Sequence, residues 1–241
     1  QPGDEVFGDL SGCGRGSFAE YACAPENVLE LKPANISFEE AAAVPTAAVV
    51  ALQNLRGKRP IQPGQKVLIN GAGGGVGTFA VQLAKYFGAE VIGVDSTEKL
   101  DMVRSIGADH VIDYTKEDFT KSGQRYDLIL DVVVHRSVFD YKRALSPEGI
   151  TVMVGGSTTR VFSNLLLGPL VFITGSKKMG LVKWEPNKKE DLVFLKELFE
   201  AGKVKPVIDR CYPLSKVAEA FRYLEEGHAQ GKVVITVEHN N

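Results

Sequence analysis

The sequence predicts an α/β fold, a doubly wound parallel sheet whose two chain ends follow a different pattern. Three observations predict it. From Val67 onward, short β-branched runs alternate with helical patterns, which is the rhythm of successive strand–helix–strand units. The predicted strands are almost continuously apolar, as expected for a sheet that helices cover on both faces. A glycine-rich loop directly follows the first of these strands and opens a helix.

The expected elements of the sheet domain follow one another in a regular order. Strands are expected at KVLIN (66–70), EVIGV (90–94), HVID (110–113), YDLIL (126–130) and ITVMV (150–154), and helices at 76–87, 98–106 and 138–145. Each strand is short and rich in branched apolar residues, and each helix has apolar residues at helical spacing. The order predicts βαβ units with parallel strands.

The two ends of the chain lack this rhythm. Residues 1 to about 35 are turn-rich, and a helix is expected from about Phe38 to Leu55, with Ser37 able to cap it. Near the other end, Ser215 is expected to cap an amphipathic helix that Gly227 stops, followed by a strand. We interpret the ends as parts of one lobe. The predicted division is 1–58, 59–203 and 204–241.

Composition narrows the class of protein. The chain has 241 residues, is 44% hydrophobic and 24% charged, and carries a net charge of −2 without charged blocks, which favours a small-molecule substrate over nucleic acid or a membrane. The three cysteines have no metal-ligand spacing and favour a reducing, cytoplasmic setting. The longest apolar run, 41–52, is too short to span a bilayer. Because the first residue is Gln1 and not Met, the sequence leaves an organellar targeting peptide open.

The glycine loop predicts a dinucleotide site. In AGGGVG, Ala72 takes the first position of the usual G-x-G-x-x-G pattern, followed by Gly74 and Gly77, with Gly75 beside them. Small residues allow a pyrophosphate to approach the backbone, and N–H groups at the start of a helix bind its charge. The preceding strand, the following helix and the acidic residue that ends the next strand complete the fingerprint.

Two signals about the nucleotide conflict. Asp95 ends the second strand, where an acidic side chain typically binds the adenosine ribose of NAD and repels the extra phosphate of NADP. Ser96, Lys99 and Tyr114 could instead bind and neutralise a 2′-phosphate. A solvated helix charge at Lys99 and a rim aromatic at Tyr114 are the simpler alternatives.

The motifs resemble those of one family. GDEVFG, GSFAEY, AAAVPTAAVVALQNL, GAGGGVGTFAVQLAK, VRSIGADHVIDY and GHAQGKVVI occur in that order and resemble the medium-chain dehydrogenase/reductase superfamily, on its zinc-independent quinone oxidoreductase branch. The group that includes the mitochondrial reticulon-interacting quinone reductases and bacterial alcohol dehydrogenase-like proteins is the most similar. The resemblance implies a Rossmann domain, a GroES-like catalytic lobe formed by both chain ends, and an N-terminal part of that lobe outside this chain.

The resemblance also implies site residues. Gly74, Gly75 and Val76 would contact the pyrophosphate, and Ser96, Lys99 and Tyr114 would surround the 2′-phosphate of NADPH. Further contacts would come from Val132 beside the adenine, Gly155 near the nicotinamide ribose, and the turn from His228 to Gln230, with Ala229 within it, over the adenosine end. NADPH is therefore the expected cofactor, with NADH as the alternative.

Some positions depart from the family pattern. DVVVH has Val134 and His135 where glycines are usual, Val50 replaces a common Thr, and Asp95 replaces a small or neutral residue. No metal is expected, because the helix that would carry a late zinc ligand reads VPTAAVVAL and the cysteines of a structural zinc lobe are absent.

The expected function is NAD(P)H-dependent hydride transfer to a quinone or to an activated C=C or carbonyl acceptor. A zinc-free alcohol or enoyl reductase of the same superfamily and a non-catalytic NAD(P)H-binding scaffold or sensor are the alternatives. No catalytic residue is assigned, and Lys177, Lys178 and Asp209 are interpreted as surface charges. A homodimer is expected, with residues 165–175 either pairing across a two-fold axis or forming a buried edge strand.

Overall fold

A six-stranded parallel sheet forms the centre of the molecule. The computed structural model describes residues 1–14, 16–57, 59–172, 176–186 and 188–237. The strand order is β5-β4-β3-β6-β7-β8, and all five pairings are parallel. The strands are β3 (Lys66–Asn70), β4 (Glu90–Asp95), β5 (His110–Asp113), β6 (Tyr126–Asp131), β7 (Leu145–Met153) and β8 (Lys178–Leu181). The parallel sheet that the sequence predicts is confirmed.

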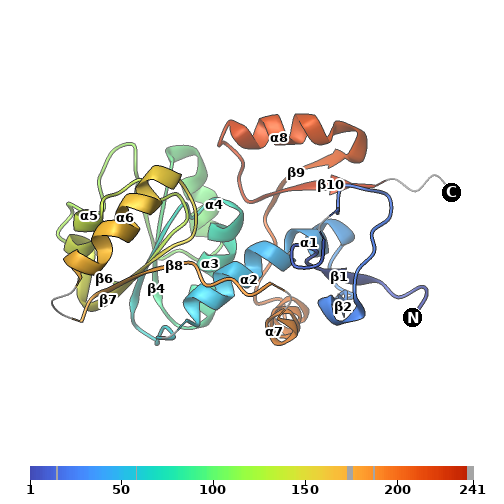
Figure 1. The fold of residues 1–241 in the computed structure, drawn as a ribbon, viewed down its shortest axis with the longest axis horizontal. Helices are drawn as coiled ribbons and strands as arrows, with labels where there is room; N and C mark the ends of the chain where they lie inside the picture. Colours follow the sequence, from blue (N-terminus) through green and yellow to red (C-terminus); the bar gives the residue numbers. More distant parts are fainter. Residues whose placement is uncertain (15, 58, 173–175, 187, 238–241) are drawn as a thin grey trace.

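Helices cover both faces of the sheet (Figure 1). They are α2 (Pro45–Leu55), α3 (Gly75–Tyr86), α4 (Leu100–Ser105), α5 (Val138–Ala144) and α6 (Thr158–Val171), while α7 (Lys189–Glu200) packs against α2 and the short strand β2 (Leu29–Leu31). Successive residues of β3 enter different cores: Val67 and Ile69 pack in the cluster that contains residues of α2, α3 and α7, whereas Leu68 packs with Tyr141 of α5. Because side chains alternate across a strand, this burial on both faces explains the continuous apolar runs.

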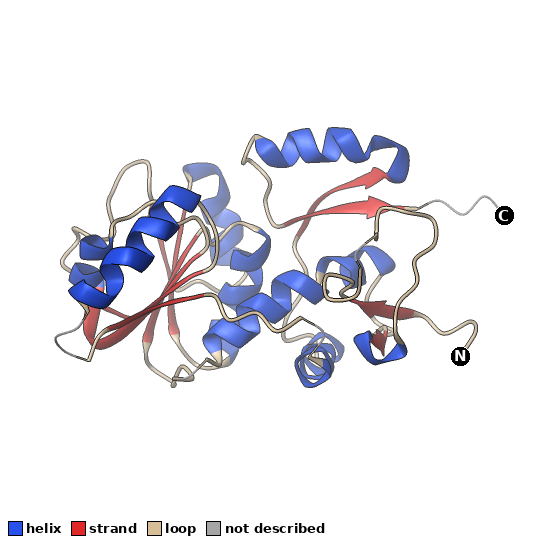
Figure 2. Cartoon of the chain, in the orientation of Figure 1, coloured by secondary structure: helices blue, strands red, loops and turns tan. Residues whose placement is uncertain are grey.

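The two ends of the chain meet beside the sheet domain. Strand β1 (Val6–Gly8) pairs antiparallel with β2 (Leu29–Leu31), and β9 (Ile208–Pro213) pairs parallel with β10 (Lys232–Thr236), with α8 (Val217–Glu225) between the last two in sequence. Helix α1 (Phe38–Ala43) contacts β1, β9 and β10. Figure 2 shows these short strands on the opposite side of α2 from the large sheet. Short 3-10 helices lie at Glu26–Val28, Thr97–Lys99 and Leu214–Lys216.

The first helix of the chain differs from its prediction. Ser37 caps α1 as expected, and it forms a capping box with Glu40. The single helix expected over 38–55 is wrong, because it ends at Ala43 and a second helix begins at Pro45. Proline lacks the N–H that a continuing helix would need, but it fits the first position of a new one.

Two further expectations about elements are corrected. Helix α8 begins at Val217 with Lys216 as its N-cap, and Ser215 lies inside the preceding 3-10 helix, so Ser215 is not the cap. Gly227 does follow the helix end, with a φ of 76°. Residues 165–171 belong to α6 and not to an edge strand, while 173–175 lie outside the described residues. Strand β8 forms this edge of the sheet instead, with β5 at the other edge.

Candidate cofactor site

A cavity of about 710 Å³ opens at the carboxyl ends of β3, β4 and β6. Asn70 and Asp95, the last residues of β3 and β4, line it, as does Val132 immediately after β6. Its opposite wall comes from the end of α8 and the turn 227–231. In open parallel sheets, ligands bind beyond the carboxyl ends of the strands, where the strand order reverses direction. Here the chain moves from β3 outward to β4 and β5, and then back to β6 on the other side of β3.

The glycine loop brings backbone to the cavity wall. Gly74 and Gly75 line the cavity, and α3 begins at Gly75 without a side-chain cap. The first N–H groups of a helix have no acceptor within the helix, so this end can bind an anion. Gly77 allows the helix to lie against the loop, because a Cβ there would lie 2.0 Å from the carbonyl oxygen of Gly71.

Asp95 holds the glycine loop. Its side chain is buried, and one carboxylate oxygen accepts the N–H of Gly73 at 2.7 Å while the other accepts the N–H of Ser96 at 2.9 Å. The ammonium of Lys99 lies 3.9 Å from the same carboxylate. A carboxylate that accepts two backbone N–H groups and has a nearby cation is stable in a buried position.

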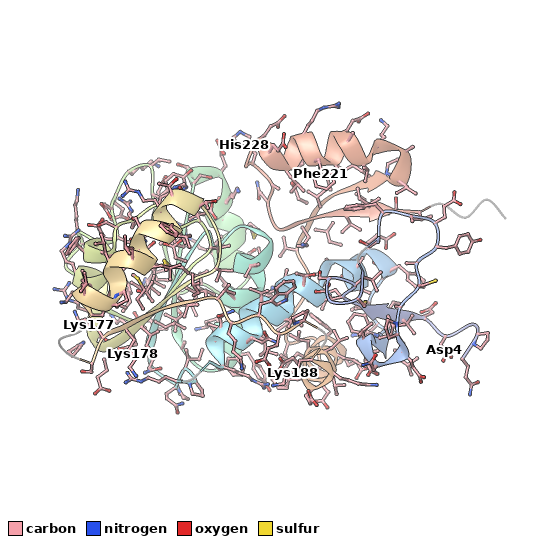
Figure 3. The ribbon with its side chains drawn as sticks, in the orientation of Figure 1. Asp4, Lys177, Lys178, Lys188, Phe221 and His228 are labelled. Carbon is pink, nitrogen blue, oxygen red and sulfur yellow. The ribbon has the colours of Figure 1, made fainter. Side chains whose placement is uncertain are left out.

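Hydrogen bonds connect both ends of the turn 227–231 to the sheet domain, one end to Lys99 after β4 and the other to the glycine loop. Lys99, which is also buried, donates from Nζ to the carbonyl oxygen of Gly227 at 3.1 Å. The N–H of Gly231 donates to the carbonyl oxygen of Gly73 at 2.8 Å. His228 lines the cavity within this turn, and Figure 3 shows it at the end of α8 that faces the sheet domain.

A buried carboxylate shapes the wall after β6. Asp131 is fully buried and accepts hydrogen bonds from Asn70 at 3.0 Å, from the N–H of Val134 at 2.7 Å and from the hydroxyl of Tyr141 at 2.7 Å. Burial, and then the charge of Asp131, raise the pKa of Tyr141. Val134 is fully buried with a φ of 30°, a left-handed conformation that is unusual for a β-branched residue. Val134 and His135 occupy the positions where the family usually has glycines. Val134 therefore adopts this unusual backbone conformation, and His135 lines the cavity.

The cavity brings together most of the site residues expected from the sequence. Those that line it are Gly74, Gly75, Asp95, Ser96, Lys99, Tyr114, Val132, His228 and Ala229. Ala72, Val76 and Gly155 are not among its lining residues. Ala72 is fully buried behind the loop, and a Cβ on Gly155 would lie 3.1 Å from the carbonyl oxygen of Val132.

Several lining residues were missed by the sequence analysis. They include Asn70, Gly71, Phe119, Arg136, Leu224 and Glu226. Arg136 is held by Asp118 at 3.0 Å and lies over the ring of Phe119 at 5.8 Å. Asn70 could have been predicted as a site residue, because it is a polar residue at the carboxyl end of a predicted strand. Phe119 could not, because its sequence pattern is that of an ordinary core residue.

Lys177, Lys178 and Asp209, which the sequence indicates are surface charges, do not line the cavity. Figure 3 places Lys177 and Lys178 at the far side of the sheet domain from His228. Asp209 accepts a hydrogen bond from Tyr223. Within the described ranges, no group of three or more His, Cys, Asp or Glu residues could hold a metal ion, and no helix is both long and apolar enough to cross a membrane.

The residues present fit a dinucleotide. The cavity volume is within the roughly 300–1,000 Å³ range of small-molecule sites. Gly74 leaves room for a close approach, because a Cβ there would find its nearest neighbour, the carbonyl oxygen of Gly71, at 3.5 Å. Uncapped N–H groups at α3 suit phosphate oxygens, and polar side chains from β4 and the loop after β5 line the adjoining wall.

Comparison with known proteins gives consistent matches. A family described as zinc-binding dehydrogenase matches residues 106–235. The 2-methylene-furan-3-one reductase of Solanum lycopersicum is 39% identical over 97% of this chain and 57% of its own length. The chloroplastic NADPH-dependent alkenal/one oxidoreductase of Arabidopsis thaliana is 36% identical over 97% of this chain and 58% of its own length. The chain thus spans less than two thirds of these relatives.

A solved structure agrees with the sequence matches. The quinone oxidoreductase from Coxiella burnetii is 30% identical, with a TM-score of 0.87 over 98% of this chain and 72% of that protein. The agreement extends to the chain ends, because the match covers almost all of this chain, including the lobe beside the sheet.

Proposed function

The chain belongs to the medium-chain dehydrogenase/reductase superfamily, and from that premise we propose that it takes part in NAD(P)H-dependent reduction of a quinone or of an activated C=C or carbonyl acceptor. The observation that carries the proposal is the cavity at the carboxyl ends of β3, β4 and β6, with the glycine loop on one wall and the turn 227–231 on the other. When bound, the nicotinamide would supply the hydride.

The chain's own residues would bind and orient the cofactor. Gly75, the first residue of α3, would offer its backbone N–H to the pyrophosphate, while the N–H of Gly74 already donates to the carbonyl oxygen of Gly71 at 3.1 Å. Val132 would offer an apolar surface beside the adenine. The turn 227–231 would cover the adenosine and exclude water from it. Holding the cofactor in one orientation is the main contribution expected from this part of the protein.

NADPH is the cofactor that we favour, with NADH as the alternative. Both carboxylate oxygens of Asp95 already accept backbone N–H groups, and Lys99 lies close enough to offset part of the charge. This arrangement weakens the two effects expected of Asp95, ribose binding and phosphate repulsion. Ser96 and Tyr114 remain on the cavity wall as hydrogen-bond donors for a 2′-phosphate.

A simple assay distinguishes the two kinds of electron acceptor, a quinone and an activated C=C bond. One close relative is an alkenal/one oxidoreductase and another is a furanone reductase, which favours an activated C=C bond. The solved relative is a quinone oxidoreductase. Faster oxidation of NADPH with a medium-length aliphatic enone than with any quinone would therefore favour the alternative of a zinc-free alcohol or enoyl reductase.

The first experiment is calorimetric titration of this chain with NADPH and NADH, followed by assays of acceptor-dependent oxidation. Binding together with turnover of either acceptor supports the proposal. Tight nucleotide binding with no acceptor-dependent oxidation in the full-length protein favours a nucleotide-binding scaffold or sensor. If neither nucleotide binds, the proposed function is overturned for this chain.

We also propose that two copies of the chain associate through α6. Phe162, Leu166 and Leu170 recur at every fourth position and are each 68% or 69% exposed, so they form an apolar stripe on one helix face. Neighbouring Leu165 and Leu167 are also exposed. Contiguous apolar surface of this kind marks an interaction site, and a second copy would present the same stripe.

A further inference from the structure

The loop after β6 contains a strained residue. Val134 is fully buried and has a φ of 30°, and among the described residues no other non-glycine residue has a positive φ. A β-branched residue rarely adopts this left-handed conformation, which costs about 1–3 kcal/mol and is found most often at ligand-binding sites. The side chain that this conformation places is that of the next residue, His135.

Asp131 and the loop after β7 hold this strained segment. The Oδ1 atom of Asp131 accepts the N–H groups of Val133 at 3.0 Å and of Val134 at 2.7 Å, and its Oδ2 atom accepts the hydroxyl of Tyr141 at 2.7 Å. Gly156, in the loop after β7, approaches the same segment so closely that a Cβ there would lie 2.0 Å from the carbonyl oxygen of Val133. The surroundings therefore fix the backbone that carries His135.

The imidazole of His135 is available at the cavity wall. His135 is exposed and lines the cavity. Within the described ranges its ring nitrogens take part in no hydrogen bond or ion pair, whereas the next residue, Arg136, is bound to Asp118 at 3.0 Å. Glycine is the usual residue of the family at this position. A contact made by the imidazole is therefore one that the usual glycine could not make.

His135 belongs to the side of the cavity where the base of a dinucleotide is expected. In this fold the adenosine ribose lies at the end of the second strand of the sheet domain, which here is the end of β4 at Asp95. The loop after β5 lies at that strand end, because the N–H of Tyr114 donates to the carbonyl oxygen of Asp95 at 3.2 Å. It also meets the loop after β6, where Arg136 lies over the ring of Phe119 at 5.8 Å.

Three planar side chains therefore line the cavity beside the expected ribose. They are those of Tyr114, Phe119 and His135. Because the base is attached directly to this ribose, it would lie against this part of the wall. His135 is the member of the group that the strained backbone holds in place.

We propose that His135 binds the adenine base of the dinucleotide, with the plane of its imidazole ring against the face of the base. Histidine is one of the side chains on which nucleic acid bases stack, and a side chain on a fixed backbone loses less freedom on binding than one on a mobile loop. This inference rests on the proposed function, because it assigns a residue to the same cofactor site. The recognised chemistry is a purine base, which NADPH, NADH and ADP-ribose share.

The experiment measures the dissociation constants of the full chain for NADPH, NADH and ADP-ribose by calorimetry at fixed salt and pH. His135→Ala removes the ring and should bind all three nucleotides roughly 3-fold to 10-fold more weakly, which is the effect of one aromatic contact. His135→Phe keeps a flat ring and should bind them about as the unaltered chain does. The ratio between NADPH and NADH should not change in either variant, because both carry the same base.

Proton NMR observes the stacking directly. The ring current of a stacked base should shift the imidazole protons of His135 upfield when ADP-ribose binds. The signals that disappear from the spectrum of His135→Phe identify those protons among the four histidines of the chain.

His110→Ala is the matched control. His110 is also an exposed histidine, but it is the first residue of β5, whereas the cavity lies at the carboxyl ends of the strands. His110→Ala should therefore bind all three nucleotides as the unaltered chain does. Circular dichroism and a thermal midpoint for each variant establish that it is folded.

The outcomes separate the two proposals. If the unaltered chain binds the nucleotides and His135→Ala binds all three equally well, the inference about His135 is overturned while the proposed function stands. Equal loss of affinity in His135→Ala and His135→Phe would also overturn it, because a hydrogen bond from a ring nitrogen would then explain the histidine. If the unaltered chain binds none of the three, the proposed function itself fails.

Discussion

At the scale of single residues, Asp95 shows how a motif residue can acquire a different use. Its place at the end of β4 predicts an acceptor for ribose hydroxyls. In the structure both of its oxygens accept backbone N–H groups, one of them from the glycine loop. The N–H of Gly73 is buried and needs an acceptor, and Asp95 provides it. The position of the carboxylate was predictable, but its direction depends on the conformation of the loop.

The role of Asp95 can be tested by substitution. Asp95→Ala removes the acceptor of the Gly73 N–H, and an unsatisfied buried donor costs about 1–3 kcal/mol. We expect weaker binding of NADH and NADPH by comparable factors, because the loop that both require is disturbed. Asp95→Asn keeps one oxygen acceptor, so its affinity for both nucleotides should lie between that of Asp95→Ala and that of the unaltered chain. A loss confined to NADH, measured by calorimetry, would contradict this structural role.

Lys232, at the start of β10, should lower the free energy of unfolding at neutral pH, because burial disfavours its charged form. Its folded-state pKa is below the ordinary value of 10.5, so the unfolded chain binds more protons between these two values, and the free energy of unfolding rises with pH there. Lys232→Met should therefore be more stable than the unaltered chain at about pH 7, by about 1.4 kcal/mol for each unit of pKa lowering. The difference should shrink as the pH approaches the ordinary value.

Urea unfolding of both proteins at neutral and alkaline pH measures this effect. Lys188→Met is the matched control, because its lysine is exposed and should give no pH-dependent difference. A constant gap between Lys232→Met and the unaltered chain at every pH would show that packing, and not charge, causes the change.

At the scale of elements, local pattern predicted the part of the chain nearest the site. Strand β3 begins and ends where the sequence predicts, and α3 is displaced by one residue at each end, because strand, loop and helix are all marked by their own residues. Helix α6 was not recognised. Its run of leucines is compatible with a strand as well as with a helix. Only the three-dimensional structure shows that these residues form an apolar stripe on the surface of a helix.

Gly77 provides the sharpest test of the loop between β3 and α3. A Cβ there would lie 2.0 Å from the carbonyl oxygen of Gly71 and 2.8 Å from the backbone of Ala72. Backbone cannot yield as a flexible side chain does, so Gly77→Ala should lower the free energy of unfolding by at least about 2 kcal/mol. It should also weaken nucleotide binding.

The control for this substitution is Gly180→Ala in the edge strand β8, where nothing lies within 4 Å of a Cβ. Alanine there should change the free energy of unfolding by no more than about 0.5 kcal/mol. Equal stability of the two variants in urea would contradict the close approach of α3 to the loop.

At the scale of the whole molecule, the site exists because two distant parts of the chain meet. The glycine loop and the acidic strand end could be predicted from adjacent residues. The turn 227–231 reaches the same cavity from the far end of the sequence, and its hydrogen bonds to Gly73 and Lys99 depend on the fold.

The apolar stripe on α6 leads to a prediction about assembly. A stable interface buries at least about 1,000 Å² in total, and the stripe supplies an apolar centre for one. We expect the chain to sediment as a dimer, and Leu166→Glu to sediment as a monomer because it would bury a charge against its symmetry mate. Tyr21→Glu, at a side chain that is 84% exposed, should leave the dimer intact.

Because association stabilises the folded state by mass action, the thermal midpoint should rise with protein concentration for the unaltered chain and not for Leu166→Glu. A monomer at every concentration would mean that the stripe meets a different partner or none.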